Sequence, residues 1–354
     1  MSRCGIVIGC LIAFFLVGCK STGDTIAKSA KKQYDKTQPL ERLAFGSCNK
    51  HDSEQPLWGA IIEKDPDVWL WLGDIIYGDT ESRSRLQKYY SLQKKRPGYQ
   101  QLLNTGCSVI GIWDDHDYGV NDGDKSYPIK EASRDLLFDF LDVPEDDESR
   151  KREGAYSSHT YGIGENKVKV ILLDGRYFRD ALVADKKTKQ RYQKNAGGKL
   201  LGEEQWEWLE NELRNSDAAV HLMGCGIQVI PEEHYFEKWA NFPSERERLF
   251  DLLLEAKVKA PILLSGDRHI GEFSKIERDG FSEPIYEMTS SGLTHYYSGM
   301  KSPEVNKYRE GKLVADYNYG LIEFEWEKET VGVHMQLLGL DNILHEEVQL
   351  QFDR

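Results

Sequence analysis

The sequence has no excess of positive charge, no internal repeat, no low-complexity segment and few cysteines. Among its 354 residues, 46 Lys and Arg are outnumbered by 59 Asp and Glu, so the net charge is −13. Because phosphate backbones are held by clustered Lys and Arg, this balance argues against a protein that coats nucleic acid. It still allows a small anionic ligand held by a few local cations. Charged residues (30%) and hydrophobic residues (40%) lie in the globular range, which excludes a disordered or fibrous chain.

Long hydrophobic runs are also absent, except at the N-terminus. The run from about Gly5 to Val17 follows Arg3 and is shorter than the roughly 20 residues that span a bilayer. It has the length of a signal-peptide core, and it ends in Leu-Val-Gly-Cys19, which resembles a bacterial lipobox. We therefore expect residues 1–18 to be a lipoprotein signal peptide and Cys19 to be lipidated. The alternative is an N-terminal anchor helix with an incidental Cys.

The segment after Cys19 is polar, Lys-rich and poor in large apolar side chains. We expect residues 19–40 to be the lipidated Cys and a flexible tether, followed by a single domain over residues 41–354. This predicts a protein of the bacterial cell envelope, anchored to a membrane by its N-terminal lipid at the periplasmic face or the outer membrane. No obligate protein partner is evident.

Three cysteines would remain in the exported chain, and an odd number indicates a free thiol or a metal ligand. Cys107 and Cys225 read as small buried residues. Cys48 ends one of several short apolar runs that stop at residues able to bind metal or phosphate. These runs begin at Leu43, Val68, Val109, Val168, Val220 and Pro261. Their length and their β-branched content predict strands.

Apolar residues at helical spacing predict helices over 55–64, 129–142, 201–214 and 245–256. After residue 270 the pattern becomes all strand, with apolar runs over 285–288, 320–326, 331–338 and 343–350. Strands that alternate with helices and are then followed by strands predict an α/β (α+β) fold with mixed sheets and helices outside.

Ligands of such sheets bind beyond the carboxyl ends of the strands. The residues at these ends should therefore meet at one rim, and they are Cys48, Asp74, Asp115, Asp267 and His269. An Asp that follows a buried strand is often only a turn former or a helix N-cap. Three such exits in one chain, Gly-Asp, Asp-Asp-His-Asp and Gly-Asp-Arg-His, favour a metal site instead.

The residue types at these exits suit a pair of cations. Asp74 is a short carboxylate on a rigid strand and could bridge two ions, which would also share an activated hydroxide. Asp115 and Asp267 would add hard oxygen ligands, and His269 would add an imidazole.

Two further donors and one acid complete the candidate site. The thiolate of Cys48 and the phenolate of Tyr77 favour ferric iron, whereas carboxylates alone favour calcium or magnesium. His116 is flanked by carboxylates and could protonate a leaving alkoxide as general acid.

The motifs that carry these residues run in order through most of residues 43–295. They are FGSCNK (45–50), WLGDIIYGD (71–79), WDDHDYGVND (113–122), VKVILLDGRYFRD (168–180), LGEEQWEWLENEL (201–213), LLSGDRHIGEF (263–273) and EMTSSGLTH (287–295). With them the chain resembles the PhoD-like (alkaline phosphatase D) family of the calcineurin-like metallophosphoesterases. The resemblance implies a four-layer αββα sandwich of two mixed sheets flanked by helices. It also implies hydrolysis of phosphate esters outside the cytoplasm, with Fe(3+) and Ca(2+) as cofactors.

The resemblance also implies roles for single positions. Ser47-Cys48 stands where the wider superfamily has Asp-x-His, and Tyr77 is added three residues after Asp74. The superfamily's Gly-Asn-His-Asp becomes residues 114–117, and its Gly-His-x-His becomes residues 266–269. The implied general acid is His116, and the implied metal ligands are Cys48, Asp74, Tyr77, Asp115, Asp267 and His269.

Three assignments stay open. Arg176 could bind phosphate in bidentate fashion, or could form a structural ion pair with Asp174 or Asp180. Gln228 could approach a metal, or could be a buried amide that hydrogen-bonds a strand edge. His295 could contact substrate, or could be a structural histidine.

The sequence as a whole predicts an exported, lipid-anchored, metal-dependent phosphoesterase whose partner is a phosphate-ester substrate. It would hydrolyse phosphomonoesters, phosphodiesters or both, with a hydroxide as nucleophile and His116 as general acid. One alternative is a specialised phospholipase or other phosphodiesterase on the same scaffold. Another is a non-catalytic surface lipoprotein that binds metal or a phosphorylated glycan. His116 argues against the second alternative, because binding alone needs no acid at that position.

Overall fold

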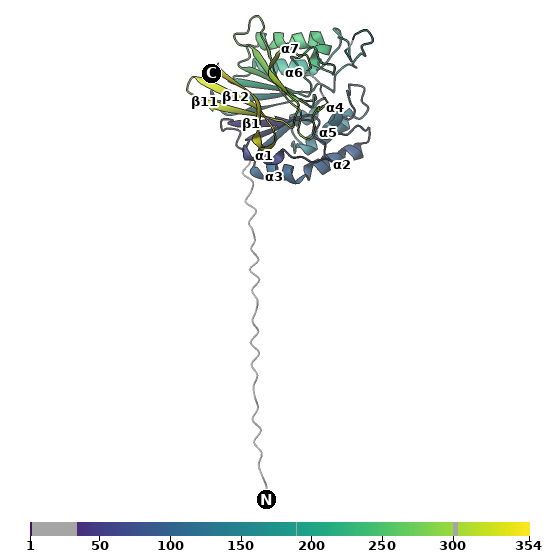
Figure 1. The fold of residues 1–354 in the computed structure, drawn as a ribbon, viewed down its shortest axis with the longest axis vertical. Coiled ribbons are helices and arrows are strands. Elements are labelled where there is room, and N and C mark those ends of the chain that lie inside the picture. The colour runs from purple at the N-terminus through teal and green to yellow at the C-terminus, as the bar shows by residue number, and fades with distance from the viewer. Residues whose placement is uncertain (2–33, 189, 300–303) are drawn as a thin grey trace. The chain divides into compact units, whose positions relative to one another are not determined.

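Two β-sheets packed face to face form the centre of the structure, a computed structural model that describes residue 1 and residues 34–188, 190–299 and 304–354 (Figure 1). The first sheet has six strands, in the spatial order β13 (Leu344–Asp353), β12 (Thr330–Leu338), β11 (Tyr319–Trp326), β1 (Arg42–Gly46), β2 (Val68–Leu72) and β3 (Ser108–Ile112). The second has seven, in the order β10 (Arg309–Val314), β8 (Gly271–Ile276), β9 (Ile285–Ser290), β7 (Pro261–Ser265), β6 (Val220–Cys225), β5 (Val168–Leu173) and β4 (Ser157–Tyr161).

Helices cover the outer face of each sheet. In Figure 1, α6 (Glu203–Arg214) and α7 (Pro243–Glu255) lie together on one side. The opposite side carries α1 (Trp58–Glu63), α2 (Arg83–Lys94), α3 (Pro97–Thr105) and α5 (Lys130–Phe140), and the short α4 (Asp115–Tyr118) lies next to α5. The mixed sheets and flanking helices confirm the predicted four-layer αββα sandwich.

Strand β2 shows why its sequence folds in this way. All its residues are apolar and buried, as expected for a central parallel strand that is covered on both faces. On the outer face Trp69 and Trp71 pack edge to face, with ring centroids 5.3 Å apart, and both contact Trp58 of α1. On the inner face Leu70 and Leu72 meet the opposite sheet at Gly224 of β6.

The second sheet buries its outer face in the same manner. Both α6 and α7 are amphipathic, and their apolar stripes pack on that sheet in a single cluster. The helix residues of this cluster include Trp206, Leu209, Leu213, Leu249 and Leu253, and the strand residues include Ile171, Met223 and Leu263. These two helices begin and end within two residues of the ranges that the sequence predicts.

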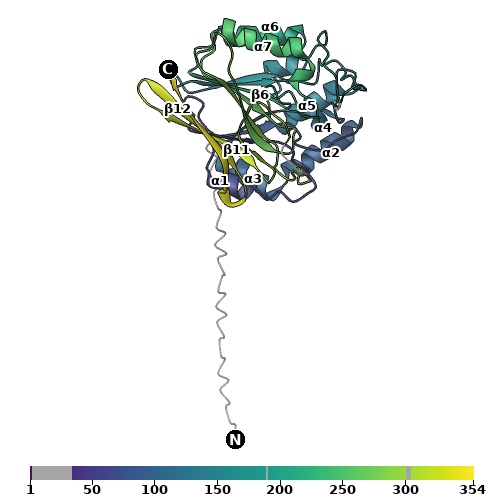
Figure 2. The same cartoon turned by 45° about the horizontal axis from the view of Figure 1, so that its top comes forward.

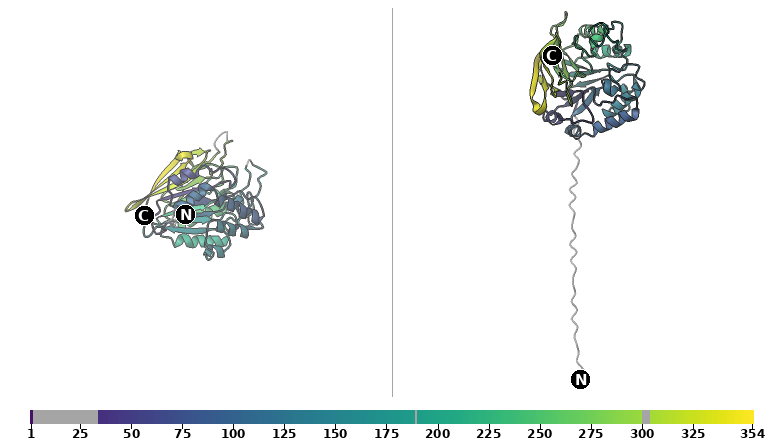
Figure 3. Two further views of the ribbon diagram at one scale, coloured as in Figure 1. Left: turned by 90° about the horizontal axis from the view of Figure 1, so that it is seen from below. Right: turned by 45° about the vertical axis from the view of Figure 1, so that its right-hand side comes forward.

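The C-terminal strands, which carry no family signature, complete the first sheet. Strand β11 pairs antiparallel with β1, with Phe45 opposite Gly320, and β12 and β13 continue the sheet outward. Figures 2 and 3 show these strands, in yellow, at one flank of the domain. Strand β13 is largely polar and exposed, as is common for an edge strand.

The folded domain begins earlier than the sequence predicts. The sequence predicts residues 34–40 to be part of the flexible tether, but Leu40 is fully buried. Tyr34 lies 6.0 Å from Tyr161 between ring centroids, and its backbone N–H donates to the carbonyl of Gly106. These contacts hold residues 34–40 on the domain, so the predicted boundary at residue 41 is too late. The predicted signal peptide and Cys19 lie outside the described residues, apart from residue 1. Within the described part of the chain, no helix has the length and apolar character needed to cross a membrane.

The close approach of the two sheets at Gly224 can be tested. A Cβ at this position would lie 2.7 Å from Cδ2 of Leu72 and 2.9 Å from Cδ2 of Leu172. We expect Gly224→Ala to destabilise the fold by roughly 1–3 kcal/mol, because the extra methyl group overpacks the core.

The matched control is Gly59 in α1, whose Cβ would meet nothing within 4 Å. Gly59→Ala should stabilise the fold by about 0.5–1 kcal/mol, because Ala is the better helix former. Denaturant unfolding of the two variants beside the parent chain measures both effects. Equal stability of the Gly224→Ala variant and the parent would contradict the packing described here.

Candidate metal centre

The parallel strands of both sheets end at a common rim. Strand β2 pairs in parallel with β1 and β3, and β6 pairs in parallel with β5 and β7. The side chains that follow these strands therefore converge, as the sequence predicts. They line a cavity of about 110 Å³, whose walls include Asp74, Asp115, His116, Asn121, Asp122, Arg191, Phe236, Glu237, Asp267, Arg268, His269 and Tyr297.

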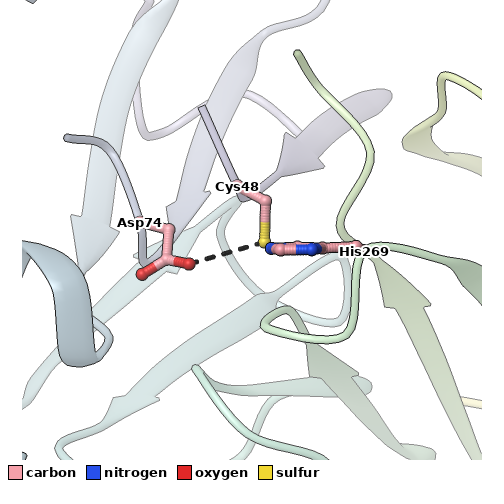
Figure 4. A group of neighbouring side chains, drawn as sticks. All are labelled: Cys48, Asp74 and His269. Atoms are coloured by element: carbon pink, nitrogen blue, oxygen red, sulfur yellow. Dashed lines mark hydrogen bonds between the residues drawn. The ribbon is translucent and has the colours of Figure 1, made fainter. Parts of the chain in front are cut away.

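The metal-ligating side chains fall into overlapping groups whose donor atoms lie within 4.8 Å of one another. Cys48, Asp74 and His269 form one group (Figure 4), in which the thiol donates to Oδ2 of Asp74 at 3.5 Å. Asp74 also belongs to a second group, with Asp115 and His116. Asp74 thus lies between two candidate ion positions, as expected of a bridging carboxylate.

Asp267 has acidic neighbours that its motif does not indicate. Its carboxylate forms a third group with those of Asp114 and Glu237. Glu237 also belongs to a fourth group, with Asp115 and Asp122. The oxygen-rich side of the centre therefore extends beyond the predicted ligands. Asp122 ends the quoted WDDHDYGVND motif, whereas Glu237 lies in a loop without any strand-exit pattern that could have indicated it.

Tyr77 contacts two imidazoles and the thiol of Cys48. Its hydroxyl oxygen lies 3.1 Å from Nε2 of His269 and 3.1 Å from Nε2 of His295. It also interacts with the thiol of Cys48. His295 therefore lies at the edge of the centre, in contact with two of its predicted ligands.

Four of the predicted ligands have a left-handed backbone. The φ angles are 59° at Cys48, 50° at Asp74, 65° at Asp267 and 55° at His269. Non-glycine residues in this region cost on the order of 1–3 kcal/mol each and persist where the surroundings require them. Here the sharp turn after each strand points the ligand side chain back toward the rim.

The buried carboxylates repel one another in the absence of cations. Burial raises the pKa of Asp74, and the charge of Asp115 raises it further. Burial likewise raises the pKa of Asp267, with the charges of Glu237 and Asp115 adding to the effect. Oδ1 of Asp115 and Oδ2 of Asp114 are buried without a hydrogen-bond partner. Cations would satisfy these oxygens and remove the repulsion, so the residues fit bound metal ions.

His116 stands beside the metal ligands with one ring nitrogen already engaged. Nδ1 lies 2.9 Å from the carboxylate of Asp79, and the ring packs on Tyr77 with centroids 4.2 Å apart. Burial lowers the pKa of His116, but the hydrogen bond to Asp79 and the charges of Asp74 and Asp115 outweigh it and raise the pKa to about 10. Asp79 ends the WLGDIIYGD motif, but nothing in the local sequence indicates that it is the partner of His116.

Arg176 is an internal ion-pair residue in this structure. Its guanidinium is buried, and every nitrogen donates to an acceptor of the protein: Asp114, Glu237 or the carbonyl of Gly123. The structure therefore favours the ion pair over a phosphate contact. The expected partners of the guanidinium were wrong. Arg176 donates to Asp174 through its backbone N–H and not through its side chain, and Asp180 pairs with Lys125.

The other open positions are also placed. Gln228 is fully buried and donates to Glu272 and Thr289, each at 2.8 Å, which favours the buried-amide alternative. Cys225 is buried and accepts from the indole of Trp239, whereas Cys107 is only half-buried.

A two-sheet α/β scaffold with thiol, phenol, imidazole and carboxylate donors at one rim defines a protein built to hold metal ions. Residues 43–333 match the family described as PhoD-like phosphatase, and this chain belongs to that family. It is 27% identical, over 300 residues, to alkaline phosphatase D of Bacillus subtilis (strain 168). That match covers 72% of this chain and 49% of the relative, so the chain spans about half of the relative's length.

Solved structures show the same fold. A structure of PhoD matches with a TM-score of 0.64 at 18% identity, and the match covers 91% of this chain and 71% of the PhoD chain. The structure of GAP50, the anchor in the inner membrane complex of Plasmodium, matches with a TM-score of 0.54 at 10% identity and 90% coverage of both chains.

The His116–Asp79 pair gives a prediction that needs no turnover. Asp79→Asn removes the carboxylate at Nδ1, so the pKa of His116 should fall from about 10 by roughly one unit or more. NMR titration of the imidazole in metal-free protein measures the shift. Because the pKa is raised above 6.5, the pair stabilises the fold below about pH 6.5, and this contribution is lost as pH rises through about 10.

The control is Asp146→Asn, a change at an exposed position in the loop before residue 148. It should leave the titration of His116 unchanged. A pKa of His116 that is the same in Asp79→Asn and in the parent would contradict the pairing.

Proposed function

We propose that this protein is an exported, lipid-anchored, metal-dependent phosphoesterase. The observation that carries the proposal is the position of Asp74, which belongs to two ligand groups, beside the His116–Asp79 pair at one cavity. Membership in the PhoD-like phosphatase family supports the same reaction class. Paired metal ions with an adjacent acid suit the hydrolysis of a phosphate ester.

Cys48, Asp74, Tyr77 and His269 would hold one ion, and Asp74 with Asp115 and Asp267 would hold the other. Bound there, the ions would activate water and neutralise charge on the phosphoryl oxygens. We propose Fe(3+) on the thiol and phenol side and Ca(2+) on the carboxylate side. The supporting argument is donor chemistry, since thiolate and phenolate favour an oxidised transition metal and carboxylates favour hard cations.

His116 would act on the leaving group. Because Asp79 occupies Nδ1, the other ring nitrogen is the one left to face substrate. Nε2–H would transfer its proton to the ester oxygen as the P–O bond breaks, so that an alcohol leaves and the imidazole becomes neutral. Asp79 would hold the ring in place and favour its protonated form.

The lipid anchor rests on the N-terminal sequence. A short apolar run ending in Gly18-Cys19 supports lipidation of Cys19 and a place in the bacterial cell envelope, at the periplasmic face or the outer membrane. A phosphodiesterase or phospholipase on this scaffold is the second candidate, since the same centre suits either ester.

Turnover tests the proposal directly. We expect the chain from residue 20 onward, supplied with iron and calcium, to hydrolyse a chromogenic phosphomonoester or its diester, and the faster ester identifies the class. Asp74→Asn should lower the rate at least about 100-fold, which corresponds to about 2.7 kcal/mol in the activation free energy. The reason is that a neutral amide replaces the carboxylate that would bridge the two ions.

Asp65→Asn is the matched control, because Asp65 also has a left-handed backbone (φ 47° against 50° at Asp74) but lies outside the cavity. It should keep the parent rate. Folded, metal-loaded protein that hydrolyses neither ester would overturn the proposal and favour a binding role.

The iron assignment predicts a colour. Phenolate and thiolate ligands on ferric iron should give a visible charge-transfer band, which Tyr77→Phe and Cys48→Ser should each shift or abolish. Cys107→Ser, which changes a half-buried thiol outside the centre, should leave the band unchanged. Fully active, colourless protein without iron would refute the assignment.

A further inference from the structure

Buried positive charge also lines the cavity. Arg268 lines the cavity and is only 5% exposed. Its guanidinium packs on the ring of Phe236, 4.2 Å from the centroid, and one terminal nitrogen pairs with the carboxylate of Glu304. Nε of Arg268 is buried without a hydrogen-bond partner. This side chain thus has donor capacity left for an anion in the cavity.

A second cation lies close to Arg268. Lys238 is 3% exposed, and Nζ donates to the carbonyls of His234 (2.7 Å) and Phe236 (2.8 Å). No carboxylate forms an ion pair with Lys238 among the residues that the structure describes. Burial lowers its pKa to about 8, and the charge of Arg268 contributes.

The third member of this cluster is His234, which is 5% exposed. Both of its ring nitrogens are buried without a partner. Burial lowers its pKa, and the neighbouring charges of Arg268 and Lys238 lower it further, so the imidazole is neutral and offers one donor. Buried donors and like charges are costly unless an anion satisfies them.

The carboxylate of Glu304 provides only part of the compensation. Its side chain is 20% exposed and contacts one nitrogen of Arg268. A carboxylate placed on a cavity-lining guanidinium occupies a position that an anionic group of a ligand could take instead. Phosphate matches the fork of a guanidinium better than a single carboxylate contact does.

The size of the cavity restricts what reaches Arg268. A volume of about 110 Å³ is well below the roughly 300–1,000 Å³ of pockets that enclose a whole small ligand. Phosphate groups fit such a space, while the rest of a larger substrate would stay outside. The carboxylates of the cavity would bind cations and through them the reacting phosphate, so Arg268 in the same cavity suits a second anion.

We propose that Arg268, supported by the charge of Lys238, is a specificity-determining residue that binds a non-reacting phosphate of the substrate, with Glu304 giving way to it. The preferred substrates are therefore esters that carry at least two phosphate groups. This inference rests on the proposed phosphoesterase function and adds the substrate class to it.

The test uses linear alkanediols of three to six carbons, each as monophosphate and as α,ω-bisphosphate. Release of inorganic phosphate by the metal-loaded protein gives kcat/KM, and the bisphosphate values are halved because two equivalent esters react. We expect the halved kcat/KM of the best bisphosphate to be at least tenfold higher than the kcat/KM of the corresponding monophosphate. Arg268→Gln should lower this preference ratio at least tenfold, whereas loss of structure alone would lower both substrates together.

Two variants complete the test. Glu304→Gln should lower KM for the bisphosphate several-fold, because it removes the competing carboxylate. Arg278→Gln is the matched control: Arg278 also pairs with a carboxylate, Glu247, and packs 4.4 Å from the centroid of Phe250, but outside the cavity. It should leave the preference ratio unchanged.

The possible failures are distinguishable. Hydrolysis of the monophosphates with no preference for any bisphosphate would overturn this inference and leave the proposed function standing. A preference that persists in Arg268→Gln would also overturn it. Hydrolysis of none of these esters, nor of the chromogenic esters, would overturn the proposed function and the inference together.

Discussion

Mutual repulsion among buried carboxylates at one rim is the constraint on which the rest of this structure depends. Asp74, Asp114, Asp115 and Asp267 are drawn together where parallel strands end, and burial raises the pKa of three of them, Asp74, Asp114 and Asp267. Two kinds of positive charge can relieve the repulsion. One is a buried arginine, because Arg176 pairs with Asp114 inside the protein. The other would be metal ions bound in the cavity.

The backbone is shaped to hold these groups despite their repulsion. Left-handed turns at Cys48, Asp74, Asp267 and His269 point side chains of both sheets toward one place. Gly73 allows the turn at Asp74, because its φ is +84° and a Cβ there would lie 2.2 Å from Cβ of Asp114. Such local strain persists only when packing on both sides of the sheets supports it. The tryptophan-rich face of β2 and the helices α6 and α7 supply that packing.

The cavity is lined by both acidic and basic side chains. Acidic side chains and His116 line the cavity together with Arg268, whose charge lies close to that of Lys238. A chain with a net charge of −13 would repel polyanions over most of its surface. Under the proposed function, the cation Arg268 in the cavity would let the protein select a phosphorylated substrate.

The sequence by itself determined the layers, most strands, four helices and the motif residues, because apolar periodicity and strand-exit patterns are local. It did not indicate α2 and α3, which bury few side chains each, or the contacts of residues 34–40. Tertiary structure alone decided that Arg176 pairs with Asp114 and Glu237, that Asp79 holds His116, and that Glu237 and Arg268 reach the cavity. These partners are up to 62 residues apart, and no local pattern encodes which charges a fold brings together.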